Sequence, residues 1–234
     1  MNELNLDNII GWQKNSFNDF PRAVSTVLFF SGCNLRCPYC HNKQIVLSEL
    51  SPIDADELRL FLTNRKNVID GVVLTGGEPT IHENIVDVIT YLKSMSYLVK
   101  LDTNGLMFET VKRVIAKIDY LAIDVKTTPR LYKSKLKSSY DNNHERLSST
   151  INIATISKVP FEIRVTAVPG LIDDDICHEI GLMINGIKQL YLQNMNVGVE
   201  TLDPTYSQLK QFSKEDMERF QQIFLKYVKY CDIR

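Results

Sequence analysis

Short apolar runs alternate with longer amphipathic segments along most of the chain. Six runs rich in β-branched and aromatic residues predict buried strands, at residues 24–30, 71–74, 98–101, 120–125, 161–168 and 189–193. Segments with helical periodicity lie between or after them, at residues 54–62, 81–95, 108–117, 145–157, 173–185 and 214–230. This alternation predicts an α/β fold with a parallel sheet. Because about eight strand–helix units close a barrel, six predict an open, partial (β/α)6 barrel of the TIM type.

The chain has no obvious point of division. It lacks a Gly/Ser-rich linker, a low-complexity tract and an internal repeat, so we predict a single domain over residues 1–234, with the partial barrel at about 23–230. No apolar run approaches the ~20 residues of a membrane-spanning helix. The polar, acidic start, residues 1–8, does not resemble a signal peptide. Together with unpaired cysteines, these features predict a cytoplasmic protein.

The charge balance narrows the choice of partner. Lys and Arg number 27 against 28 Asp and Glu, which gives a net charge of -1. A general nucleic-acid-binding surface or an anionic-membrane binder would need an excess of positive charge. We therefore expect neither nucleic acid nor membrane as a partner.

The residues with the most distinctive chemistry follow the predicted strands directly. They form five groups, at residues 33–40, 76–79, 102–105, 124–126 and 169–170. In parallel α/β barrels the carboxyl ends of the strands meet at one face, and catalytic groups gather there. We therefore predict that these five groups share one site.

Three cysteines on one loop indicate the chemistry of that site. Cys33, Cys37 and Cys40 have the spacing C-x3-C-x2-C in the loop at residues 31–43, after the first predicted strand. Three thiolates on a short loop suit three corners of a cubane iron–sulfur cluster. The remaining cysteines, Cys177 and Cys231, are far away in the sequence. The fourth iron would therefore be open to a substrate or cofactor.

Other roles for these cysteines fit the sequence less well. A structural zinc site needs four ligands, and His41 follows Cys40 too closely to reach the same metal easily. A disulfide framework is improbable in a long chain with five cysteines and no secretory signal. Burial as core residues disagrees with the loop residues between the cysteines, among them Asn34 and Pro38. The iron–sulfur interpretation is preferred.

Two further groups offer ligand contacts at strand ends. Gly76 and Gly77 remove side chains where a ligand could approach the backbone, next to the carboxylate of Glu78. A tight turn into a helix is an equally good explanation. Asp102 could bind a hydroxyl, an ammonium group or a cation, whereas Asn104, before a glycine, is also an ordinary turn signal.

Charged residues also occur within apparent core strands. Asp124 and Lys126 are two positions apart, so they face the same side of a strand. Arg164 lies inside the apolar run 161–168, where it would suit a carboxylate ligand. Structural ion pairs would explain the same pattern.

The C-x3-C-x2-C motif followed by Gly76-Gly77-Glu78-Pro79 resembles the radical S-adenosylmethionine (radical SAM) enzymes, over nearly the whole chain. The glycyl-radical-enzyme activases are more similar still, through residues 32–42, 101–105, 124–126, 163–164 and 168–170. Within that group, residues 17–21, 191–193 and 201–204 resemble the anaerobic ribonucleoside-triphosphate reductase activating proteins. The chain departs from the family pattern at Arg22, where a glycine is usual, and at Lys43, often a proline.

The resemblance implies two cofactors, a 4Fe–4S cluster on Cys33, Cys37 and Cys40, and S-adenosylmethionine chelated to its open iron. It places Tyr39 near the adenine, and Gly76, Gly77 and Glu78 at the methionine amino end. The residues that it places around the ribose and carboxylate are Asp102, Asn104, Asp124, Lys126 and Arg164.

The implied reaction uses reduced flavodoxin or ferredoxin as electron donor and forms a 5′-deoxyadenosyl radical. This radical takes a hydrogen atom from a glycine of the partner, for which anaerobic ribonucleotide reductase is the first expectation. Three alternatives stay open. The partner could be another glycyl radical enzyme of the pyruvate formate-lyase type, the substrate could be a small molecule, or the protein could be a cluster-binding electron carrier or sensor.

Overall fold

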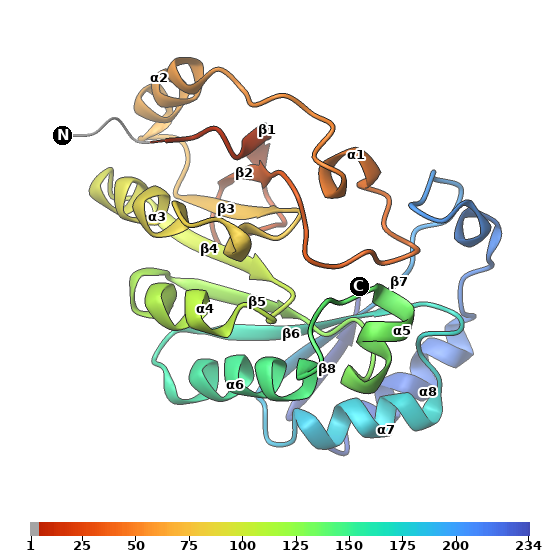
Figure 1. Cartoon of the computed structure of the whole chain (residues 1–234). Coiled ribbons are helices and arrows are strands. Elements are labelled where there is room, and N and C mark those ends of the chain that lie inside the picture. Colours follow the sequence, from red (N-terminus) through yellow and green to blue (C-terminus); the bar gives the residue numbers. More distant parts are fainter. Residues whose placement is uncertain (1–4) are drawn as a thin grey trace.

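One curved sheet of eight strands organises the molecule (Figure 1). The computed structural model describes residues 5–234. The strands lie in chain order across the sheet, and they are β1 (Ile9–Ser16), β2 (Ser25–Phe30), β3 (Gly71–Gly76), β4 (Leu98–Thr103), β5 (Tyr120–Asp124), β6 (Phe161–Ala167), β7 (Gln189–Asn194) and β8 (Tyr230–Ile233). β1 pairs antiparallel with β2, and each later strand pairs in parallel with its predecessor. β1 and β8 form the two edges, so the sheet is not closed.

The connections between parallel strands are mostly helical. The α-helices are α1 (Lys43–Val46), α2 (Ala55–Arg65), α3 (Ile85–Ser94), α4 (Phe108–Val114), α5 (Tyr132–Leu136), α6 (Asn143–Ile156), α7 (Asp174–Met183) and α8 (Lys214–Phe224). Four short 3-10 segments accompany them, at Pro79–Ile81, Ile115–Lys117, Pro129–Leu131 and Pro204–Gln208. Side chains cap three of the longer helices: Asp54 begins α2, Asp173 begins α7 and Ser213 begins α8. Each accepts hydrogen bonds from free backbone N–H groups of the first turn.

The predicted open α/β barrel is confirmed, and the six predicted strands correspond to β2–β7. Two strands were not predicted. β1 adds an antiparallel edge, and β8 begins at Tyr230, the last residue of the predicted helix at 214–230. The predicted helix at 214–230 was therefore too long, because α8 ends at Phe224. Tyr230 instead pairs with Gln189 of β7. The backbone N–H and C=O groups of β8 therefore find their hydrogen-bond partners in the sheet, and a longer helix is not needed to pair them.

Side chains alternate between the two faces of the sheet. On β3, Val72 and Leu74 belong to the large apolar core beneath the helices, whereas Val73 belongs to a small cluster with Phe20, Val27 and Tyr120. This is the period of two that a strand imposes on its side chains. The large core therefore lies between sheet and helices, and the opposite face of the sheet is the concave one.

The concave face becomes polar from β4 onward. Lys100 and Asp102 project from β4, and Glu162 and Arg164 from β6, while their neighbours Leu101 and Ile163 pack in the large core. The Tyr120 hydroxyl donates to Glu162 at 2.9 Å. Charged groups so deep in a sheet need partners, and a network of ion pairs supplies them. The ion pairs of this network continue to the carboxyl ends of β4 and β5.

Candidate functional site

The cysteine loop lies between β2 and α1 and is held at several points. Gly32 N–H donates to the Ile45 carbonyl at 2.7 Å, and Arg36 N–H donates to the Leu136 carbonyl at 2.7 Å. Leu136 ends α5, a short helix that the sequence pattern did not reveal. The Arg36 guanidinium also donates to the Cys33 carbonyl at 2.6 Å. The loop thus has a fixed shape despite having little regular secondary structure.

The segment after β7 supports the same loop from the other side. Leu202 N–H donates to the Cys40 carbonyl at 2.8 Å, and Asp203 N–H donates to the Pro38 carbonyl at 2.9 Å. Figure 1 shows this blue segment beside α1 and the orange loop. Leu202 and Asp203 belong to the stretch whose sequence resembles the reductase activating proteins. In the structure they brace the loop that carries the thiols.

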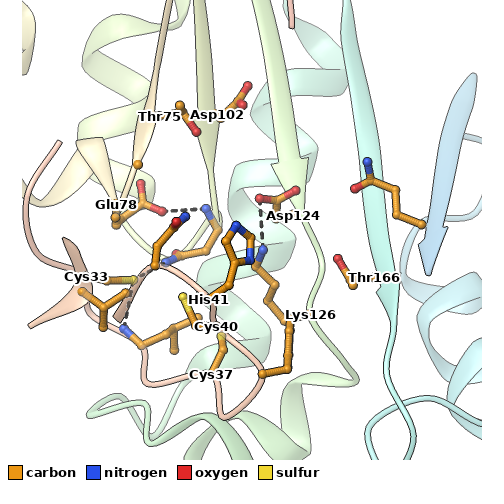
Figure 2. Close-up of a pocket in the computed structure, with 18 of the residues that line it drawn as sticks. Cys33, Cys37, Cys40, His41, Thr75, Glu78, Asp102, Asp124, Lys126 and Thr166 are labelled. Atoms are coloured by element: carbon orange, nitrogen blue, oxygen red, sulfur yellow. Dashed lines mark hydrogen bonds and ion pairs between the residues drawn. The ribbon is translucent and has the colours of Figure 1, made fainter. Parts of the chain in front are cut away.

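The three thiols of the loop share one pocket. Cys33, Cys37 and Cys40 all line it, and none is part of a disulfide (Figure 2). Burial, reinforced by the Glu78 carboxylate, raises the pKa of Cys33 to about 12. Burial also raises the pKa of Cys37, to about 11. Such thiols become thiolates at neutral pH only when a metal replaces the proton.

The pocket has a volume of about 550 Å³, within the usual range for small-molecule sites. It brings together every residue predicted for cluster or cofactor except Arg164. Besides the cysteines, the predicted residues that line it are Tyr39, Gly76, Gly77, Glu78, Asp102, Asn104, Asp124 and Lys126. They come from the ends of β3, β4 and β5 and from the cysteine loop. The predicted convergence of strand-end groups is therefore present, although their contacts with a cofactor stay a prediction.

The structure gives a steric reason for the glycines at positions 76 and 77, at the end of β3. Gly77 N–H donates to the Phe30 carbonyl at 2.8 Å, and Glu78 N–H donates to the Gly32 carbonyl at 2.8 Å. A Cβ on Gly77 would lie 1.8 Å from the Gly32 oxygen. A Cβ on Gly76, whose φ is +112°, would lie 2.6 Å from the Phe30 nitrogen. The glycines therefore let the backbone after β3 lie against the start of the cysteine loop.

Glu78 is a buried carboxylate with almost all its acceptor capacity in use. Its Oε1 accepts from Thr80 N–H at 3.1 Å and from the Thr103 hydroxyl at 2.7 Å, and the Thr80 hydroxyl also binds it. Its Oε2 accepts from Asn104 N–H at 2.7 Å. Burial raises the pKa of Glu78, although these hydrogen bonds oppose the effect. Glu78 thereby fixes the ends of β3 and β4 relative to each other.

A row of alternating charges crosses the floor of the concave face. Lys100 lies 2.7 Å from Asp102, and Arg164 lies 3.1 Å from Asp102 and 2.7 Å from Asp124. Lys126 continues the row at 3.1 Å from Asp124, as Figure 2 shows. Burial alone would raise the pKa of Asp124, but Arg164 and Lys126 hold it well below its usual range. The Asp124 carboxylate is therefore ionised, and the ion pairs hold both carboxylates in position.

Arg164 does not line the pocket. Its guanidinium binds both Asp102 and Asp124 and so holds the two carboxylates in place, and a contact of Arg164 with a carboxylate ligand stays a prediction. Lys100 was not among the predicted site residues. The signal was its spacing: Lys100 and Asp102 are two apart, as Asp124 and Lys126 are.

The opposite wall of the pocket comes from the last three strands and was not predicted. Its residues include Thr166, Gln193, Asn194, Asn196 and Arg234. Thr166 follows Arg164 by two positions and so shares its face, which is the one signal that the sequence offered. Gln193 was noted only as part of residues 191–193, which resemble the reductase activating proteins, and no site role was predicted for it. Arg234 reaches the pocket because β8 pairs with β7.

Two histidines lie at the edge of this arrangement. His41 lines the pocket, and burial and the nearby Lys126 charge lower its pKa. The His82 ring nitrogen lies 2.7 Å from the Ser31 carbonyl, which begins the cysteine loop. The sequence gave no reason to connect His82 with the site, because the contact joins positions 51 residues apart.

The donor set fits an iron–sulfur cluster. Three thiols face one cavity, and Leu35 N–H already donates to Cys33 Sγ at 3.4 Å, as backbone groups do around cluster sulfurs. Among residues 5–234, no three His, Cys, Asp or Glu side chains meet closely enough to hold a single metal ion. A cubane cluster makes a different demand, because each thiolate binds its own iron atom.

In the same range, no helix is long and apolar enough to cross a bilayer.

Comparison with known proteins agrees with this reading of the site. The family model described as the radical SAM superfamily matches residues 27–183. The chain belongs to the radical SAM superfamily. Members of this superfamily use a 4Fe–4S cluster and S-adenosylmethionine, which are the two cofactors predicted for this chain.

Three relatives show the range of similarity. "Putative glycyl-radical enzyme activating enzyme" of Methanocaldococcus jannaschii is 29% identical over 92% of this chain and 91% of its own length. Pyruvate formate-lyase-activating enzyme of Clostridium pasteurianum is 30% identical over 44% of this chain and 46% of its own. "Probable GTP 3',8-cyclase" of Pyrococcus abyssi is 30% identical over 68% of this chain and 52% of its own.

A solved structure shares the fold. Streptococcus suis SuiB bound to S-adenosylmethionine superposes with a TM-score of 0.60 at 16% identity. The superposition covers 88% of this chain and 51% of the SuiB chain, so the match involves about half of that protein. At such low identity the likeness concerns the partial barrel alone.

Proposed function

We propose that this radical SAM enzyme is an activase that generates a glycyl radical on a partner protein, anaerobic ribonucleoside-triphosphate reductase. When bound, the cluster and S-adenosylmethionine would supply the radical chemistry, with reduced flavodoxin or ferredoxin as the electron donor and a glycine Cα of the partner as the source of the hydrogen atom. The protein's part is to position these groups and to admit one segment of substrate.

The observation that carries the proposal is a group of uncharged polar side chains, Thr166, Gln193 and Asn196, in the wall of the pocket opposite the thiols. Among the described residues, no hydrogen bond joins the side chains of Thr166, Gln193 or Asn196 to the rest of the protein. A hydroxyl and two carboxamides can each pair with the N–H and C=O groups of a peptide backbone. Such a wall suits a glycine-containing segment, which offers backbone groups and no side chain at the reacting carbon.

The cations of the pocket argue against a highly charged small substrate. Lys126 is paired with Asp124, and Arg234 lies 3.7 Å from Glu162. The Arg234 guanidinium also stacks on the Tyr191 ring, 3.2 Å from its centroid. A nucleotide with several phosphates normally binds to unpaired cations or to a glycine-rich helix N-terminus. Within residues 5–234, both Lys and Arg side chains that line the pocket already have acidic partners.

The relatives support the same choice. The Methanocaldococcus jannaschii relative aligns over nearly the full length of both chains and is named as a glycyl-radical enzyme activating enzyme. The more specific target, the ribonucleotide reductase, rests on the resemblance of residues 17–21, 191–193 and 201–204 to its activating proteins. Two of these residues, Leu202 and Asp203, donate hydrogen bonds to the cysteine loop, which supports a role for this stretch near the thiols.

Electron paramagnetic resonance under anaerobic conditions tests the proposal. The reconstituted, reduced protein would be mixed with S-adenosylmethionine and with the anaerobic ribonucleotide reductase of the same organism. We expect a glycyl-radical doublet that requires all three components and disappears when the target glycine of the reductase is replaced by alanine.

The other outcomes are equally informative. If 5′-deoxyadenosine forms without a doublet, the chemistry is supported but the target is wrong, and a pyruvate formate-lyase-type partner is tested next. If neither appears from a fully loaded cluster, the activase proposal fails, and an electron carrier or sensor becomes the better description.

A further inference from the structure

Two buried hydrogen-bond donors beside the thiols have no partner. They are the side-chain amide nitrogen of Asn34 and the hydroxyl of Tyr39, and both are inaccessible to solvent. Neither finds an acceptor of normal geometry among residues 5–234. Buried polar groups are almost always paired, so an exception at a cofactor site indicates a missing partner. Both residues belong to the cysteine loop, one directly after Cys33 and one directly before Cys40.

The orientation of the Asn34 amide is fixed by its surroundings. Leu106 N–H donates to Asn104 Oδ1 at 3.1 Å, so Asn104 must present its Nδ2 group on the other side. That Nδ2 donates to Asn34 Oδ1 at 2.7 Å. A flipped Asn34 would set two donors against each other. Asn34 therefore presents its Nδ2 group as a free donor, and Asn104 is the residue that positions it.

Both donors lie close to cluster ligands. Cys33 Sγ is 3.9 Å from Asn34 Oδ1 and 4.0 Å from Asn104 Nδ2, so the Asn34 amide lies next to that sulfur. The Tyr39 hydroxyl lies near the Cys37 thiol, and Tyr39 stands between Cys37 and Cys40 in the loop. The neighbouring Tyr132 hydroxyl, in contrast, is already engaged, because it accepts from Lys126 N–H at 3.0 Å.

We propose that Asn34 Nδ2 and the Tyr39 hydroxyl donate hydrogen bonds to sulfur atoms of the 4Fe–4S cluster and thereby raise its reduction potential. The acceptors are the cysteine thiolates or the inorganic sulfides of the cluster. Reduction adds one electron from the external donor, with no bond broken and no proton transferred. The added charge spreads over the sulfurs, so hydrogen bonds to them stabilise the reduced form more than the oxidised form.

This role would matter because the physiological donor must reduce the cluster before S-adenosylmethionine can be cleaved. Asn34 and Tyr39 would act as positioning residues of the cluster. Asn104, which follows β4, would hold the Asn34 amide in place through its hydrogen bond to Asn34 Oδ1. The inference rests on the cluster, which the family establishes, and is independent of which protein receives the radical.

A redox titration of the reconstituted protein without S-adenosylmethionine tests the inference. The midpoint potential would be followed by paramagnetic resonance of the reduced cluster in the wild type, Tyr39→Phe and Asn34→Ala, with iron and sulfide content measured in each. Each variant should lower the ratio of reduced to oxidised cluster at a fixed potential by roughly three- to tenfold, where tenfold corresponds to about 59 mV for one electron. The effects of the two variants should add.

Tyr97→Phe is the matched control. Its hydroxyl is also buried, but it donates to the Leu62 carbonyl at 2.6 Å, away from the pocket. Removing it should leave the midpoint potential unchanged. Omitting S-adenosylmethionine separates a bond to the cluster from a contact with adenine, which the resemblance had suggested for Tyr39.

Two results would overturn the inference. The first is an unchanged midpoint in fully loaded Tyr39→Phe and Asn34→Ala. The second result applies if Asn34→Ala does not bind iron. The reduced wild-type protein, labelled with 15N in its asparagine side chains, would then be measured by pulsed paramagnetic resonance. The absence of any nitrogen coupled to the cluster would overturn the inference. A coupled nitrogen that is absent from Asn34→Asp would support the assignment of Asn34, whereas one that remains in Asn34→Asp would belong to Asn104, whose Nδ2 lies 4.0 Å from Cys33 Sγ, and would overturn it.

Discussion

Replacing Gly77 by alanine should dislodge the cysteine loop. A Cβ at this position would lie 1.8 Å from the Gly32 oxygen and 2.6 Å from the Gly32 carbonyl carbon. Real Cβ contacts are essentially never shorter than 3.0 Å, so the two backbones must separate by at least 3.0 − 1.8 = 1.2 Å. Neither backbone can yield by a side-chain rotation. The strain therefore falls on the peptide that leads directly into Cys33.

The energetic cost follows from the bonds between the two segments. The separation stretches the bond from Glu78 N–H to the Gly32 carbonyl, now 2.8 Å, and leaves a buried donor unpaired. Losing such a bond and stranding its donor costs about 2–3 kcal/mol. For a chain of this size, that corresponds to a fall in melting temperature of roughly 5–10 °C.

Two measurements on one preparation check this expectation. Anaerobic reconstitution followed by iron and sulfide analysis should show a substoichiometric cluster, and thermal unfolding of the cluster-free protein should show the lower melting temperature. Gly11→Ala is the matched control, because a Cβ there meets only a Phe29 ring carbon at 3.9 Å. A Gly77→Ala protein that binds a full cluster and melts with the wild type would refute the steric argument.

Three further expectations concern the thiols, the charge row and the substrate wall. Cys37→Ala should abolish both iron binding and cleavage of S-adenosylmethionine, whereas Cys231→Ala should retain both; a full cluster in Cys37→Ala would remove it from the ligands. Arg164→Met should lower the free energy of unfolding by about 1.5–3 kcal/mol at pH 7, because Asp102 and Asp124 each lose a charge-assisted hydrogen bond and keep only Lys100 and Lys126 as partners. The pKa of Asp124 is lowered in the folded wild type, so the stability it contributes is present above its unfolded value of about 3.9 and is lost as the pH falls through the folded value. The deficit of Arg164→Met in urea unfolding should therefore shrink below about pH 4, and a deficit independent of pH would contradict the pairing. Gln193→Leu should lower the number of glycyl radicals formed per 5′-deoxyadenosine, measured by spin counting against product analysis, and an unchanged ratio would argue against a peptide contact.

The sequence by itself determined the features that depend on local chemistry and on periodicity. The spacing of Cys33, Cys37 and Cys40 predicted a cluster loop, and the structure brings the three thiols to one pocket, because loop length and spacing act over a few residues. The six apolar runs specified a parallel sheet, since a strand buried on both faces must be apolar almost throughout. Because parallel strands bring their carboxyl ends together, the convergence of Glu78, Asp102 and Asp124 could also be predicted.

Only the tertiary structure decided which residues form the other wall of the pocket and which residues pair with its charged groups. β8 forms because the edge of β7 offers hydrogen-bond partners, which no local pattern at residues 225–233 reveals, and it carries Arg234 to the pocket. Arg164 turned out to bind Asp102 and Asp124, because strand register sets which charge faces which. Gly77 is required by contact with a loop 45 positions earlier in the chain, at Gly32. Such contacts depend on distances across the fold, and a linear pattern does not contain them.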